Sequence, residues 1–350
     1  MNFYPTPLFR SVGLALLLTI SGSAVAQQRA QQSGFARLDK SVLPISSPAT
    51  RVQGAPGNMT IIERTCASAP SADLRRRIVN TAVQEWAFFG FGVDEQRTAT
   101  PATGAGTNGN NRRRFPLLDP EEGLRIADSI GGYWAAAPNS DWILQRQNEA
   151  WNGENGLASR HRDPWSAAFI SWVMCESGLG QPEQFQRAIA HHSYIDQAIK
   201  ARDSNDNAAM YTAFDIGEAE IEPGDLLCSG MRPVYRSIEE RRQQLGVGAR
   251  THCDIVVQVD TTKGQILTIG GNVGSSVRMK VFSAAVSAAK HFTPLPTARL
   301  LFAHLKLKAT AVSQDALLQS PTLHALQCTM PVVPSSFATA SLLLPATSCE

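Results

Sequence analysis

Three separate segments of the chain contain side chains that could together attack a carbonyl group. Ser166 stands at the start of an apolar, helix-like segment, and His252 stands at the start of a strand-like one. A hydroxyl in the first turn of a helix lies near free N–H groups, which stabilise a developing anion. A histidine on a neighbouring strand could take its proton, and a third polar group could orient the imidazole. We therefore predict Ser166 as nucleophile, His252 as base, Asn272 as orienting group and the backbone near Ala167 as oxyanion donor.

Each of these residues also has a purely structural interpretation. Serine is a favoured helix N-cap, worth about 1 kcal/mol, so capping and catalysis have equal weight for Ser166. Asp254 shares a strand face with His252, and it either orients the imidazole or caps a turn. We favour the turn, because the third polar group is expected from the following strand. Asn272 lies in a Gly-Gly-Asn-Val turn, where asparagine tolerates left-handed backbone.

A second group of polar and aromatic residues could line a substrate cleft. His191, His192 and Tyr194 are close in sequence and could face a groove, although a helix-surface pair is the simpler interpretation for at least one histidine. Trp165 and Asp254 are further candidates for the cleft, with burial in the core as the favoured alternative for Trp165. No HExxH or CxxC spacing supports a metal site, so neither a metal nor another cofactor is expected.

The elements that would position these residues follow from the hydrophobic pattern. Residues 71–89, 121–131 and 142–151 have helical character, and residues 166–177 are apolar on nearly every face, which is typical of a core helix. The second half of the chain instead contains short strand-like runs at residues 225–228, 254–259, 265–269 and 299–306. Helices followed by strands indicate an α+β fold.

The N-terminus has the pattern of a cleavable signal peptide over residues 1–26. Arg10 precedes a short apolar run, and Ala24-Val25-Ala26 matches a signal-peptidase site. We expect an exported, periplasmic or extracellular protein that is soluble after cleavage and has no transmembrane anchor. Residues 27–70 are expected to form a disordered linker. Residues 71–308 form the domain, with a flexible loop at residues 97–113, and residues 309–350 form a low-complexity tail.

Charge and cysteine content add two limits. The 350 residues carry a net charge of +2, which gives no electrostatic case for nucleic-acid binding. Six cysteines in an oxidising compartment permit disulfides without indicating a disulfide-dense scaffold. Cys228 and Cys253 lie in two strands that should pair, so they form either a cross-strand disulfide or two buried thiols.

Several motifs resemble known families. PWSAAFISWV resembles the nucleophile segment of CHAP amidases and NlpC-type peptidases, with Ser166 where those families usually have cysteine. PGDLL, HCDIV and the Gly-Asn pair resemble their following strand motifs. The whole set, over residues 74–307, resembles an exported bacterial domain-of-unknown-function family, number 2272.

The resemblance implies a papain-like fold, with N-terminal helices packed on a small antiparallel sheet or barrel. It also implies a hydrolase acting on amide bonds of cell-wall peptide (peptidoglycan), with a Ser-His-Asn site. A serine hydroxyl is far less ionised than a thiol, so the enzymatic assignment stays open. The alternative is a catalytically inactive papain-like domain that binds peptidoglycan or an envelope protein partner.

Overall fold

The computed structural model describes residues 35–66, 70, 72–98 and 117–329. The helices of this part are α2 (Leu74–Phe88), α3 (Pro120–Ala136), α4 (Asp141–Trp151), α5 (Ser166–Glu176), α6 (His192–Ser204), α7 (Ile238–Arg242) and α8 (Pro321–Thr329), with 3-10 turns η1 (Pro48–Arg51) and η2 (Gly156–Ala158). The strands are β1 (Val52–Gln53), β2 (Thr60–Ile61), β3 (Val93–Gln96), β4 (Tyr211–Phe214), β5 (Leu226–Arg232), β6 (Arg250–Asp260), β7 (Gln265–Val273), β8 (Ser276–Val286), β9 (Phe292–Pro294) and β10 (Leu301–Leu307).

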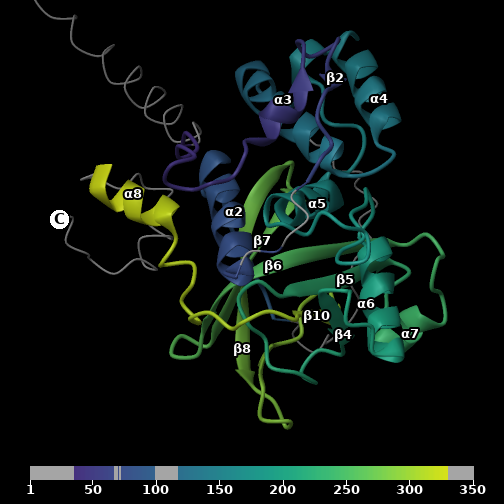
Figure 1. The fold of residues 1–350 in the computed structure, drawn as a ribbon, viewed down its shortest axis with the longest axis vertical. Coiled ribbons are helices and arrows are strands. Elements are labelled where there is room, and N and C mark those ends of the chain that lie inside the picture. Colours follow the sequence, from purple (N-terminus) through teal and green to yellow (C-terminus); the bar gives the residue numbers. More distant parts are fainter. Residues whose placement is uncertain (1–34, 67–69, 71, 99–116, 330–350) are drawn as a thin grey trace, which may run out of the picture.

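One twisted sheet contains most of these strands. Its order is β3-β8-β7-β6-β5-β10-β4, with β9 paired to β8, and every pair is antiparallel except β3 with β8. Helices α2 and α5 contact β6 and β7, and α3 packs on α5 from the side away from the sheet (Figure 1). The prediction of an α+β fold is therefore confirmed.

Helix α5 is buried along its whole length, as its apolar sequence predicts. Its N-cap Trp165 stacks on Phe89 and Tyr133, and its sheet-side neighbour is β7. A Cβ at Gly271 of β7 would lie 2.7 Å from Cβ of Phe169, so only glycine permits this approach of helix and strand. Gly178, at φ +94°, follows the helix in the left-handed conformation that suits glycine.

Asp225, the aspartate of the PGDLL motif, connects helix α2 to the sheet. Its Oδ1 accepts from Nη1 of Arg75 at 2.7 Å, and its Oδ2 accepts from Nε2 of His304 at 2.7 Å. All three side chains are buried, so their charges are compensated by one another and by backbone partners. This motif therefore has a structural role at the start of β5.

The prediction that residues 27–70 form a linker is wrong for the described residues 35–66. Leu43, Ile45, Val52 and Met59 are buried in the same core as α5. Arg37 forms an ion pair with the buried Glu85 of α2, 2.6 Å between Nε and Oε1. The segment has no helical or strand period because it contributes isolated apolar residues to a core that other elements build.

The prediction that the domain ends at residue 308 and is followed by a low-complexity tail is likewise wrong for residues 309–329. Ala316, Leu317 and Leu323 are buried, and α8 packs on α2 (Figure 1). The signal peptide, most of the loop at residues 97–113 and the end of the tail lie outside the described residues. Thr98, within that loop, forms a β-bridge with Thr297.

Two disulfides join segments distant in sequence. Cys228 and Cys253 lie directly opposite each other on β5 and β6 and are bonded, which is the pairing considered for these strands. The second bond, between Cys66 and Cys175, attaches the N-terminal segment to the end of α5 and was not expected. Both are consistent with an exported protein.

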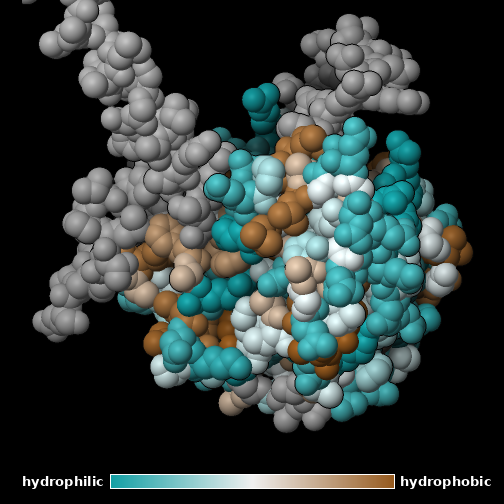
Figure 2. Space-filling view, turned by 90° about the horizontal axis from the view of Figure 1, so that it is seen from above, coloured by the Kyte–Doolittle hydropathy of each residue, from teal (hydrophilic) through white to brown (hydrophobic). Residues whose placement is uncertain are grey.

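The surface gives no sign of a membrane-spanning element in the described residues. Within those ranges no helix is long and apolar enough to cross a bilayer. Figure 2 shows a largely polar face on which the apolar patches are separate from one another. This agrees with the ordinary apolar content of the sequence.

The packing of the N-terminal segment on α3 can be tested at Gly132. A Cβ there would lie 1.9 Å from the carbonyl oxygen of Pro48 in η1, so Gly132→Ala should lower the free energy of unfolding by about 1–3 kcal/mol. Gly248→Ala is the matched control, because nothing lies within 4 Å of its Cβ position. Urea denaturation measures both. Equal stabilities would mean that residues 35–66 do not pack on α3.

Candidate active site

The hydroxyl of Ser166 is bonded to a histidine. Its Oγ lies 2.6 Å from Nε2 of His191, and both residues are buried. Ser166 is the first residue of α5, while the N-cap is Trp165, which makes no side-chain capping bond. The interpretation of Ser166 as an N-cap is therefore wrong, because its hydroxyl is directed to His191. The first intrahelical bond is donated by Phe169, so the N–H of Ala167 has no partner within the helix.

The tautomer of His191 follows from its other ring nitrogen. Nδ1 accepts the backbone N–H of Cys253 at 3.2 Å and is also bonded to the hydroxyl of Tyr194. A backbone N–H can only donate, so Nδ1 carries a lone pair and the proton of the neutral ring is on Nε2. His191 therefore donates to Oγ of Ser166 and, in this tautomer, cannot accept the serine proton.

Local packing explains why His191 reaches both α5 and the sheet. The side chain of Ser171 on α5 bonds both backbone groups of Ala188, 2.9 Å each, which fixes the segment leading to His191. On the sheet side, the pairing of β6 with β7 begins only at Ile255. The N–H of Cys253 is thus left for His191 where the two strands separate.

A second cluster lies on the adjoining strands. Nε2 of His252 is 2.8 Å from Oδ1 of Asp254, and Nζ of Lys280 on β8 is 2.9 and 2.7 Å from the two carboxylate oxygens. The three side chains are buried. Asp254 orients the imidazole, so its interpretation as a turn cap is wrong. Lys280 was not identified from the sequence, because nothing local to it marks a partner on another strand.

Gly270 and Asn272 on β7 explain why Asp254, and not Asn272, orients the imidazole of His252. A Cβ at Gly270 would lie 1.9 Å from Oδ1 of Asp254 and 3.2 Å from Nε2 of His252, so the missing side chain leaves the space they occupy. Asn272 has φ +57°, the left-handed conformation of its turn interpretation. No hydrogen bond joins the Asn272 side chain to any described residue of the site.

The two histidines lie next to each other with different bonding. Their ring centroids are 5.1 Å apart. Because an ionised carboxylate only accepts, His252 carries its proton on Nε2 and has a lone pair on Nδ1. Among the described residues, His252 makes no hydrogen bond to Ser166. The structure thus brings Ser166, His191 and His252 into one cluster, without a direct bond between the predicted nucleophile and base.

Burial sets the charge of this cluster. Desolvation lowers the pKa of His252, and it lowers the pKa of His191 further, with the neighbouring His252 adding to that shift. Burial alone would raise the pKa of Asp254, but His252 and Lys280 hold it well below its ordinary value. At neutral pH the site therefore contains two uncharged imidazoles and one ion pair, Asp254 with Lys280.

The remaining predicted residues are accounted for as follows. Tyr194 is buried, and its hydroxyl is hydrogen-bonded to Nδ1 of His191. His192 is half-buried and bonds the backbone of Ala249. Trp165 is fully buried in the aromatic core, so it does not line a cleft. The sequence suggested His191 only as a cleft residue together with His192. The one sequence signal for its role is the His-x-x-Tyr spacing from His191, the N-cap of α6, to Tyr194. No cluster of described residues could hold a metal ion.

The tautomers can be read directly by nitrogen-15 NMR of the imidazoles. We expect both His191 and His252 to carry their proton on Nε2 at pH 7, and Tyr194→Phe to leave the His191 tautomer unchanged, since the Cys253 N–H still donates. His192→Gln removes one resonance for assignment. A proton on Nδ1 of His191 would contradict the donor role assigned to this ring.

Buried neutral histidines also predict acid lability. Burial lowers the pKa of His161 to about 3, and neither ring nitrogen has a hydrogen-bond partner among the described residues. Below the ordinary value of about 6.5 the unfolded chain binds protons that the folded chain does not, so stability falls as pH falls. The slope is about 1.4 kcal/mol per pH unit for each such histidine. Denaturation from pH 7 to 4 should show this loss, reduced in His161→Phe; an unchanged slope would refute it for His161.

Comparison with known proteins gives one match. Residues 121–290, from α3 to the end of β8 and including every residue of both clusters, match the model of a family described as "Uncharacterized protein conserved in bacteria (DUF2272)". No curated protein and no solved structure matches the chain. Nearly half of this chain is therefore similar to an uncharacterised bacterial family, which supports the resemblance of its motifs to family number 2272.

Proposed function

We propose that this protein is an exported papain-like hydrolase that cleaves amide bonds of cell-wall peptide, with Ser166 as nucleophile and His252 as base. One observation carries the proposal: the histidine bonded to Ser166 and the histidine next to it have complementary hydrogen bonds. His191 donates to the serine oxygen. His252 donates its Nε2 proton to Asp254, and its Nδ1 lone pair accepts from no described residue. The hydroxyl proton of Ser166 is then directed away from His191, and His252 is the neighbouring base.

The steps follow from these positions. Substrate binding brings Ser166 and Nδ1 of His252 within hydrogen-bond reach, a tightening common on going from free to occupied sites. Oγ attacks the amide carbon as its proton passes to His252, and the N–H of Ala167 stabilises the oxyanion. His252 returns the proton to the leaving amine. It then takes a proton from the water that attacks the acyl-enzyme, and it gives that proton to Oγ of Ser166 as the ester bond breaks.

Asp254 takes the orienting role proposed from sequence for Asn272. Its bond to Nε2 fixes the ring of His252, and Lys280 keeps the carboxylate ionised inside the protein. This role needs a carboxylate that stays charged when buried. The Lys280 ion pair supplies that condition.

The papain-like fold is supported by the order of the elements. A buried helix with the nucleophile at its start packs on an antiparallel sheet, and the histidine lies near the beginning of the next long strand, β6. The predicted signal peptide and the two disulfides support an extracytoplasmic place of action. The cell-wall substrate class rests on the resemblance of the motifs to NlpC and CHAP domains.

A second candidate is an inactive domain of the same fold that binds peptidoglycan or an envelope protein. It is favoured by the resting state of Ser166, whose side chain is bonded to His191 and whose residue is only 7% exposed. The inactive domain is also favoured because no hydrogen bond joins Ser166 to His252 among the described residues. Turnover distinguishes the two candidates.

The proposal is tested with purified peptidoglycan and product analysis. Ser166→Ala and His252→Ala should each lower turnover by about 1,000-fold or more, because nucleophile and base act as one unit. His192→Gln is the matched control and should retain activity, since His192 bonds only the Ala249 backbone. Turnover by Ser166→Cys alone, with none by the natural sequence, would instead support the binding domain.

The role of Lys280 predicts a change in pH dependence. Lys280 lowers the pKa of the neighbouring His252, so Lys280→Met should raise that pKa and move the acidic limb of kcat/KM to higher pH. Lys200→Met, at an exposed position on α6, is the control. Near-UV circular dichroism confirms that each variant is folded. An unshifted limb in a folded Lys280→Met variant would remove Lys280 from the mechanism.

A further inference from the structure

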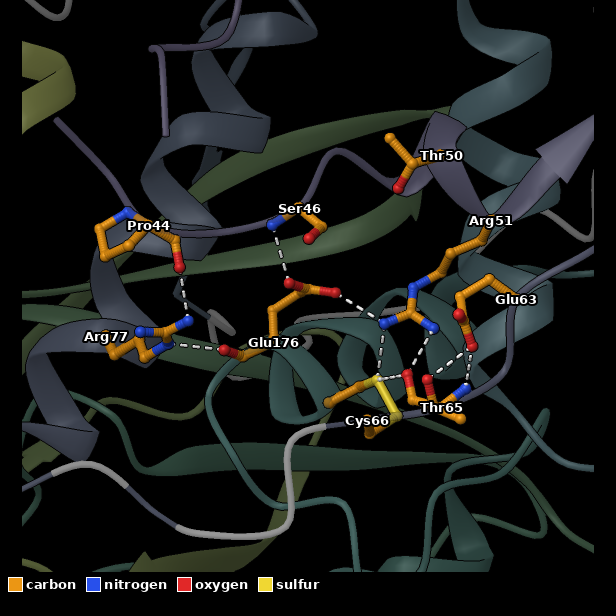
Figure 3. A pocket seen from close by; sticks show the side chains of 10 residues that line it. Pro44, Ser46, Thr50, Arg51, Glu63, Thr65, Cys66, Arg77 and Glu176 are labelled. Carbon is orange, nitrogen blue, oxygen red and sulfur yellow. Dashed lines mark hydrogen bonds and ion pairs between the residues drawn. A yellow bond between two sulfur atoms is a disulfide. The ribbon is translucent and has the colours of Figure 1, made fainter. Parts of the chain in front are cut away.

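A cleft separate from the serine site lies at the other end of α5. It has a volume of about 400 Å³ and is bounded by the N-terminal segment, by the end of α5 and by the Cys66–Cys175 disulfide (Figure 3). Cys175 lies nine residues after Ser166, which along a helix corresponds to about 14 Å. The volume is within the usual range for small-ligand sites.

The cleft has a positive and a negative side chain on opposite sides. Arg77 donates Nε to the carbonyl of Glu176 and Nη2 to that of Pro44, 2.6 Å each, so its charge meets no carboxylate among the described residues. Within the described part of the chain, Glu63 accepts only from the backbone N–H and the hydroxyl of Thr65. Figure 3 shows Arg77 and Glu63 across the cleft from each other, with Arg51 and Glu176 between them.

The middle of the cleft contains an unused donor. Arg51 is 4% exposed, and its Nη atoms bond Glu176, the Thr65 carbonyl and the sulfur of Cys175. Its Nε has no hydrogen-bond partner among the residues that the structure describes. A buried N–H without an acceptor is costly, and an incoming carbonyl oxygen would satisfy it.

We propose that this cleft binds a short peptide with both ends free. The terminal carboxylate pairs with Arg77, a peptide carbonyl accepts from Nε of Arg51, and the terminal ammonium pairs with Glu63. The charges of Arg51 and Glu176 cancel each other, so the two ends of the cleft select a ligand with separated opposite charges. The cleft does not depend on Ser166 being catalytic.

The test is calorimetric titration of trialanine into the full mature chain carrying Ser166→Ala, so that cleavage cannot consume the peptide. We expect binding, and an affinity about tenfold weaker for either N-acetyl-trialanine or trialanine amide, each of which lacks one charge. Glu63→Gln should remove the difference between free and acetylated peptide. Glutamine at this position can still accept from Thr65, which preserves the local structure. Glu154→Gln, at an exposed site elsewhere, is the matched control.

The outcomes separate this site from the serine site. Loss of discrimination in Glu63→Gln but not in Glu154→Gln assigns the peptide to the cleft. No binding at about 10 mM trialanine, or equal affinities for free and blocked peptides, overturns the proposal. Discrimination that survives Glu63→Gln also overturns it, because the peptide then lies elsewhere. None of these results depends on whether the natural protein hydrolyses peptidoglycan.

Discussion

The burial of helix α5 on all sides is the constraint that orders the rest of the molecule. Gly271 permits its approach to the sheet, and Ser171 holds the chain that leads to His191. The first residue of the helix is Ser166, and its last turn carries the disulfide and the ion pair that fix the N-terminal segment. A helix so enclosed cannot shift without disturbing both ends, so the candidate active site and the cleft are positioned by the same packing.

The two histidines of the candidate active site differ in role because their rings make different hydrogen bonds. The Cys253 N–H makes His191 a donor, and the Asp254 carboxylate leaves His252 an acceptor at Nδ1. Both rings are held neutral by burial, while Lys280 and Asp254 cancel each other. Uncharged imidazoles with opposed roles provide one hydrogen-bond donor and one base at neutral pH.

Local sequence patterns predicted what depends on local structure. The apolar run of α5, the strands of the second half and the positions of Ser166 and His252 follow from periodicity and residue type. The bond from His191 and the pairing of Lys280 with Asp254 join separate elements, so no spacing along the chain reveals them. Residues 35–66 have no local pattern for the same reason, because they complete a core formed by distant helices rather than one of their own.

The donor role of His191 bears on how a serine could act as the nucleophile in the proposed mechanism. A serine hydroxyl gives up its proton far less readily than a thiol, so an oxygen nucleophile needs stabilisation of the negative charge that develops on it. A neutral N–H donor at 2.6 Å supplies this stabilisation without the cost of burying a second cation. In the proposed mechanism His191 thus makes the Ser166 hydroxyl a stronger acid, and His252 takes its proton. The arrangement suits an oxygen nucleophile, because the bonds to Cys253 and Tyr194 fix the ring whose N–H meets Oγ.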